Sequence, residues 1–221
     1  MKRTFARIIS IVLGGSGLLL ILAVFFPIIS YNIKSRTDFQ QYLSPVPEQE
    51  FTDFTKASSW FPSAHEQQNA LASSVVKYYN LSIPKLGIHD AVVSLGGEDL
   101  SDSLIQYPGT ALPGKIGNAV VFGHSVLPTF YDPKLYLTIF STLPTLKKQD
   151  KVTVDYDGIS YEYRVTDLFE VSPEDLDVLS QETGESYISL VTCVPPGDPR
   201  SPRRLIVRAK LVPPNNDNTF L

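Results

Sequence analysis

One cysteine, Cys193, lies in the stretch SLVTCVPPGDPRSPRRLIVRAKL at residues 189–211. A lone thiol is either an inert buried side chain or a reactive group. As a nucleophile it must be a thiolate, which a nearby imidazolium or guanidinium favours. Acyl transfer also needs hydrogen-bond donors directed at the oxyanion of the tetrahedral intermediate. A cysteine, a histidine and an arginine brought together would therefore supply all three functions.

The chain has three histidines that could serve this chemistry. His124 follows the apolar run AVVF and Gly123, which places it at the end of an expected strand, where pockets form. His89 lies beside Asp90 near an expected turn, and His65 lies in a polar segment. We favour His124 and keep the other two open, because a histidine at a strand end is commonly structural.

The last expected strand, 204–212, has two different faces. One face carries apolar side chains and is expected to face the core: Leu205, Val207, Ala209 and Leu211. The other face carries basic side chains: Arg204, Arg208 and Lys210. Since alternate residues of a strand share a face, Arg204 is expected to point away from the core near the start of the strand.

Strands dominate the elements expected from residue 76 onward. Residues 151–165 predict a hairpin, because polar and apolar residues alternate on both sides of Asp157-Gly158, a dipeptide suited to a tight turn. Apolar runs predict further strands at 78–83, 88–95, 117–124 and 187–193. The helical spacing of Leu100, Leu104 and Ile105 predicts a short helix. A second short helix is expected to begin at Ser172 and Pro173.

Residues 8–29 carry no charge and are long enough for a helix that crosses a bilayer. Basic residues precede them, which predicts a cytoplasmic segment at 1–7 and an exported body. A cleaved signal peptide is the alternative, but its apolar core would be about 7–15 residues. Residues 30–75 are then a membrane-proximal spacer with one or two short helices, residues 76–212 a folded domain, and residues 213–221 a polar tail.

Composition excludes several classes of function. The net charge of the chain is −4, and all acidic residues lie beyond residue 30, so nucleic acid is not an expected partner. Three scattered histidines and one cysteine do not form a zinc motif, and no metal or cofactor is expected.

Several motifs together resemble the sortase family. SLVTC followed by Arg204 and LIVRA is similar to the sortase signature of a Thr-Leu-x-Thr-Cys strand, a loop, and an arginine that opens the next strand. AVVFGHS resembles the sortase strand that ends in Gly-His, and LSIPKLGIHDAVV resembles the opening strands. The resemblance covers residues 78–212 in the family's order, and Ser189 stands where the family usually has threonine.

The resemblance implies a mainly β fold, a closed barrel of about eight strands with short helices, behind one transmembrane helix. It implies that Cys193 is the nucleophile, His124 the general acid and base, and Arg204 the oxyanion or substrate-positioning group. Calcium dependence is not expected, since only Gln181 lies near the place of one calcium ligand of some sortases. Trp60 and Phe61 could plug a lid, but an aromatic residue packed on the domain is favoured.

We therefore expect a membrane-anchored cysteine transpeptidase that cleaves an LPxTG-like sorting signal through a thioacyl-enzyme. Its expected partners are exported proteins that bear the signal and an amine acceptor from a cell-wall precursor or a pilin. Its catalytic domain is expected outside the cytoplasm. Two alternatives remain open: a sortase-fold protein that binds sorting signals without cleaving them, and an exported β-domain that acts as a scaffold.

Overall fold

The computed structural model describes residues 13–17, 19, 21–27, 29–31, 33, 40–41, 56, 60, 76–198, 200 and 202–213. The predicted cytoplasmic segment 1–7, His65 and Phe61 lie outside the described residues. Of the predicted spacer and tail, only a few residues are described, among them Tyr31 and Trp60.

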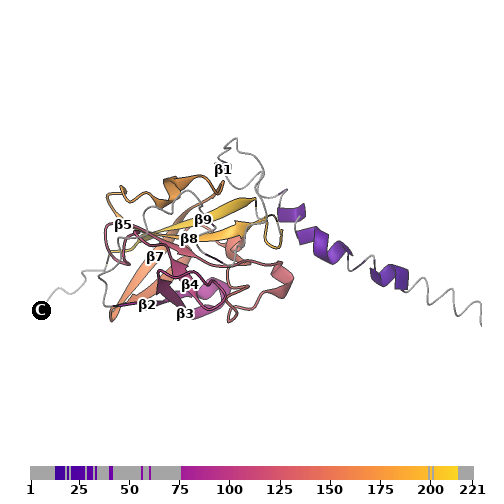
Figure 1. The fold of residues 1–221 in the computed structure, drawn as a ribbon, viewed down its shortest axis with the longest axis horizontal. Coiled ribbons are helices and arrows are strands. Elements are labelled where there is room, and N and C mark those ends of the chain that lie inside the picture. The colour runs from indigo at the N-terminus through magenta and orange to yellow at the C-terminus, as the bar shows by residue number, and fades with distance from the viewer. Residues whose placement is uncertain are drawn as a thin grey trace, which may run out of the picture.

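A closed β-barrel forms the body of the protein (Figure 1). Eight strands build it: β2 (Tyr78–Ile83), β3 (Ile88–Leu95), β4 (Leu104–Gln106), β5 (Gly117–Phe122), β6 (Lys151–Tyr156), β7 (Ile159–Val171), β8 (Ser186–Val194) and β9 (Arg203–Leu211). Their order is β7-β6-β2-β3-β4-β5-β8-β9, and pairing of β9 with β7 closes the sheet on itself. The expectation of a mainly β barrel of about eight strands is confirmed.

Strand β7 is long enough to pair with two other strands along the same edge. Its first half pairs with β6 from Tyr156↔Ile159 to Lys151↔Arg164. Where β6 stops, the two-residue strand β1 (Gln40–Gln41) pairs with β7 in parallel, opposite Phe169 and Glu170. The short strand therefore covers an edge of β7 that would otherwise be open to pairing with another chain.

Apolar side chains form two separate clusters on the two faces of the barrel wall. The interior cluster fills the barrel. It draws on all eight barrel strands and includes Leu81, Leu190 and Leu205. A smaller cluster covers the outer face of β5, β8 and β9 and includes Trp60, Phe122, Cys193 and Ile206. The barrel wall between them is thus buried on both faces, so β5 and β8 read as nearly continuous apolar runs rather than alternating ones.

The predicted hairpin at 151–165 is confirmed by the β6–β7 pairing. Asp157 and Gly158 both have positive φ, at 50° and 75°, which is the turn geometry that this dipeptide favours. The strands predicted at 78–83, 88–95, 117–124 and 187–193 are likewise present as β2, β3, β5 and β8, although β5 ends at Phe122, two residues before His124.

The short helix predicted from Leu100, Leu104 and Ile105 is wrong. Leu104–Gln106 is strand β4, which pairs in parallel with β3 and antiparallel with β5. All of its residues are buried, so both faces of the strand carry apolar residues. The resulting spacing of apolar residues resembles that of a helix and led to the wrong prediction.

The second predicted helix begins later than expected and is a 3-10 turn. The η6 turn spans Leu176–Leu179, and Asp175 caps it by accepting a hydrogen bond from the amide of Asp177. Ser172 instead donates its hydroxyl to Glu174 at 2.7 Å. Its side chain is therefore used inside the connection between β7 and η6.

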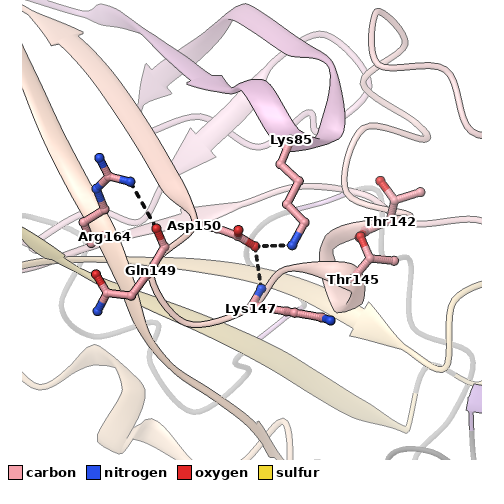
Figure 2. A network of polar contacts seen from close by, with 7 residues as sticks. All are labelled: Lys85, Thr142, Thr145, Lys147, Gln149, Asp150 and Arg164. Carbon is pink, nitrogen blue, oxygen red and sulfur yellow. Dashed lines mark hydrogen bonds and ion pairs between the residues drawn. The ribbon is translucent and has the colours of Figure 1, made fainter.

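A polar network fixes the turn that leads into β6 (Figure 2). The ammonium group of Lys85 lies 2.6 Å from Asp150 Oδ2, and the amide of Lys147 donates to the same oxygen. Arg164 on β7 donates to the carbonyl of Gln149. These contacts tie the η3 turn (Pro84–Leu86) to the β6–β7 hairpin.

Among the described residues, one helix, Leu13–Tyr31, is long and apolar enough to cross a membrane, with a mean hydropathy of 2.2. It projects away from the barrel (Figure 1). The prediction of an apolar N-terminal helix suited to membrane anchoring agrees with this finding, although the described helical residues run beyond the predicted end at residue 29.

Candidate active site

Cys193 and Arg204 lie directly opposite each other on the antiparallel strands β8 and β9. Side chains of such a pair lie on the same face, with Cβ atoms about 4.5–5.5 Å apart. Both are buried, with 5% of Cys193 and none of Arg204 exposed to solvent. They belong to the outer face of the wall, because the flanking residues Val194 and Leu205 face the barrel interior.

The end of β5 places His124 beside the same pair. Strand β5 runs parallel to β8, and their register ends with Phe122 opposite Val191. The hydroxyl of Thr192 donates to the carbonyl of Gly123, and the hydroxyl of Ser125 donates to the carbonyl of Cys193, at 2.8 and 2.7 Å. Because these bonds flank His124 on both sides, the histidine lies level with Cys193 along the two strands.

Gly123 makes this close approach possible. A Cβ atom at this position would lie 2.5 Å from Phe140 and 2.6 Å from Leu104, closer than atoms can pack. A glycine before the histidine therefore lets the end of β5 lie against the loop that follows it. This contact supplies a packing reason for the Gly-His pair.

Trp60 covers the three candidate residues. Its ring stacks on Phe122 at 5.3 Å between centroids and meets the imidazole of His124 edge-on at 6.1 Å. The guanidinium of Arg204 lies over the same ring, 5.4 Å from its centroid. No part of Trp60 is exposed. Since His124 and Arg204 contact one indole ring, the fold brings them together on one side of the wall.

Burial sets the electrostatics of Arg204. Loss of solvent lowers the pKa of the guanidinium from its ordinary value, while the neighbouring Cys193 and Glu174 act in the opposite direction. A guanidinium remains protonated under such conditions. A buried, fixed cation beside the thiol is the arrangement that favours a thiolate and a developing oxyanion.

The other residues considered from the sequence lie elsewhere. His89 is exposed on β3, far along the chain from the three residues above. Gln181 uses its amide internally: its oxygen accepts from Ala111 and Asn118, and its nitrogen donates to Asn118 and Leu179. This amide therefore joins β5 to the turn before β8.

Two residues near the site were missed or underrated in the sequence. Trp60 was expected to pack on the domain, and the structure adds that it packs on the site itself. Its signal was available, because it is the only tryptophan and stands in a polar segment. Glu170 is a carboxylate with 1% exposure in β7, and because that strand carries several other charged residues, the sequence did not single it out.

Comparison with known proteins places this arrangement in a family. A sequence model of the sortase domain matches residues 81–212, which is more than half of the chain. The chain belongs to the sortase family of cysteine transpeptidases. It is 29% identical over 149 residues to sortase A of Streptococcus agalactiae serotype III (strain NEM316), a match that spans 64% of the chain and 58% of that relative. It is 29% identical over 166 residues to sortase A of Bacillus anthracis, covering 75% and 73% of the two chains.

Solved sortase structures share the fold. Sortase C-1 of Streptococcus pneumoniae superposes with a TM-score of 0.55 at 26% identity, over 69% of this chain and 79% of that one. Sortase C-1 of Actinomyces oris gives a TM-score of 0.56 at 23% identity, over 86% and 98%. These similarities extend to proteins named both sortase A and sortase C.

Proposed function

We propose that this sortase cleaves a short LPxTG-like sorting signal and transfers the released acyl group to an amine. The observation that carries the proposal is the pairing of Cys193 with Arg204 across β8 and β9, with His124 against the same indole ring. Nucleophile, proton carrier and fixed cation are the groups that acyl transfer through a thioester requires.

In the first half-reaction, the Cys193 thiolate attacks the carbonyl carbon of the scissile peptide bond and forms a carbon–sulfur bond. Arg204 donates hydrogen bonds to the oxyanion. The carbon–nitrogen bond then breaks as protonated His124 gives its proton to the departing amine. The products of this step are a thioacyl-enzyme and a free amine on the released fragment.

In the second half-reaction, an acceptor amine attacks the thioester carbon. His124 takes the proton of the attacking amine, the carbon–sulfur bond breaks, and Cys193 returns to the thiolate. The acceptor is an amine of a cell-wall precursor or a pilin lysine. With no separate cofactor in the scheme, every proton and electron pair is exchanged between the two substrates, Cys193 and His124.

Substrate entry requires Trp60 to leave. Cys193 is 5% exposed, and a peptide carbonyl cannot reach its sulfur while the indole ring lies over Arg204 and beside His124. We propose that the described contacts are those of a closed site. The Trp60 side chain then moves aside when the sorting signal binds.

The apolar helix Leu13–Tyr31 supports a membrane-anchored enzyme with its barrel outside the cytoplasm. Its substrates would then be exported proteins that carry the sorting signal. Attachment to the same membrane raises the local concentration of both partners.

The decisive experiment is capture of the thioacyl-enzyme. Wild-type enzyme is incubated with a library of LPxTG-like peptides, and the mass of the intact protein is measured. We expect a mass increase on Cys193 and transfer to an added amine, and neither event with Cys193→Ala. A folded wild-type enzyme that binds the peptides but never forms the adduct would instead be a binding protein. Product formation by Cys193→Ala would refute the mechanism.

A further inference from the structure

The inner face of the strands that carry the site holds a buried charged contact. Glu170 on β7 is 1% exposed, and its Oε2 lies 2.9 Å from Nη1 of Arg203 on β9. Burial raises the pKa of Glu170, while its contacts with Tyr31 and Arg203 lower it. Removing Arg203 would leave the Glu170 carboxylate buried without its cation, which is costly. The contact therefore holds Arg203 firmly.

Arg203 is joined to Arg204 by more than the chain. The guanidinium of Arg204 donates through Nη1 to the carbonyl oxygen of Arg203 at 3.3 Å. Because side chains alternate along a strand, Arg203 faces inward opposite Val194, while Arg204 faces outward opposite Cys193. The inner ion pair thus fixes the residue whose carbonyl orients the outer guanidinium.

The second oxygen of Glu170 is also engaged. The hydroxyl of Tyr31, the last residue of the apolar helix, donates to Oε1 at 2.7 Å. Tyr31 packs against the interior apolar cluster as well. The Glu170 carboxylate therefore contacts both the end of the apolar helix Leu13–Tyr31 and the first residue of β9.

We propose that Glu170 is a positioning residue for the transfer reaction, which acts through Arg203 to hold the Arg204 guanidinium where the oxyanion forms. The order of contacts is Tyr31 to Glu170, Glu170 to Arg203, and Arg203 to Arg204. The proposal rests on the proposed function of Arg204. It adds residues on the inner face of the barrel wall to a site whose reacting groups all lie on the outer face.

The test compares variants of the full chain reconstituted in lipid nanodiscs. Glu170→Gln keeps the size of the side chain and a hydrogen-bond acceptor for Tyr31 but removes the charge that holds Arg203. Arg203→Gln removes the other partner, and Arg203→Lys keeps the charge. Asp167→Asn is the matched control, because Asp167 lies on the same strand in an exposed pair with Lys148. Urea unfolding of each variant establishes that the assays use folded protein.

The kinetic readout separates positioning from binding. Arg204 acts on the oxyanion of the transition state, so Glu170→Gln and Arg203→Gln should each lower kcat about tenfold with KM within about twofold. The double variant should lose no more than the worse single variant, since both break one contact. Arg203→Lys should recover most of kcat, and Asp167→Asn should match the wild type. Multiplied losses in the double variant, or an unchanged kcat in Glu170→Gln, would overturn the proposal.

A spectroscopic readout works without turnover. Trp60 is the only tryptophan of the chain, and the Arg204 guanidinium lies over its ring. Glu170→Gln and Arg203→Gln should change the emission maximum and intensity of Trp60, whereas Arg203→Lys and Asp167→Asn should not. If wild-type enzyme transfers no peptide, the proposed function fails. The fluorescence measurement still decides whether Glu170 positions Arg204. Unchanged emission in Glu170→Gln sinks the inference even if the enzyme is active.

Discussion

Both faces of the β8–β9 pair are buried, but by different parts of the molecule. On the inner face, Val194, Leu190 and Leu205 join a cluster that fills a closed barrel. On the outer face, Cys193 and Arg204 lie beneath Trp60, a residue distant in sequence from both strands. The inner face is closed by the barrel itself, while the outer face is covered by the Trp60 side chain, which the proposed reaction requires to move. In the proposed mechanism, burial on the outer face therefore controls access to the reacting groups.

The largest expected effect on activity falls on the outer face. Arg204→Ala should lower kcat about 10²–10³-fold, because one fixed oxyanion donor commonly contributes that much. Arg204→Lys keeps a charge but not the planar guanidinium, and it should recover only part of the rate. Stopped-flow measurement of thioester formation checks both. A kcat for Arg204→Ala within about threefold of wild type would remove Arg204 from the oxyanion site.

The interior apolar cluster should show the opposite pattern. Leu81 lies on β2, which pairs with neither β8 nor β9, and it is fully buried in the interior cluster. Leu81→Ala should lower the free energy of unfolding by about 2–5 kcal/mol, because it leaves a cavity in a closed core. The kcat of the folded fraction should stay within about twofold. Urea titration followed by active-site titration measures both quantities. A large fall in kcat per folded enzyme would contradict the expected difference between the interior cluster and the outer face.

Removal of the outer cover should expose the thiol. Trp60→Ala should raise the rate at which iodoacetamide alkylates Cys193 about tenfold or more. The buried aromatic contacts of Trp60 stabilise the closed site by about a few kcal/mol, and their loss favours the open site. Phe130→Ala is the control, since Phe130 is 67% exposed in the loop beyond His124. Alkylation at the wild-type rate in Trp60→Ala would show that Trp60 does not limit access.

The smallest expected effect is a pH dependence of stability from the inner charged contact. Burial raises the pKa of Glu170 above its ordinary value of 4.5, against the opposing influence of Tyr31 and Arg203. A group with a raised pKa in the folded state contributes stability that is present below the unfolded pKa and is lost as the pH rises through the folded pKa.

Wild-type enzyme should therefore lose stability relative to Glu170→Gln between about pH 4 and neutral pH. Urea midpoints of the two proteins at matched pH values test the sign. A difference that grows in favour of the wild type as the pH rises would mean that Arg203 outweighs burial.

Much of the barrel could be predicted from local patterns, and the exceptions share one cause. The β6–β7 hairpin shows alternation on both sides of Asp157-Gly158, and its turn angles match. Strand β4 was mistaken for a helix because both of its faces are buried, and such a strand carries no period of two. The 3-10 turn at η6 was displaced because Asp175, rather than Ser172, caps it.

For the site, the sequence by itself determined which residues could do the chemistry. A single cysteine, a histidine after a strand and an arginine that opens the next strand are local facts, and alternation places Arg204 and Leu205 on opposite faces. Only the tertiary structure decided that Cys193 and Arg204 are paired, that Trp60 covers them, and that Glu170 meets Arg203 and Tyr31. The reason is physical: each of these contacts joins segments far apart in the chain. Their meeting depends on strand register and barrel closure, which no local pattern encodes.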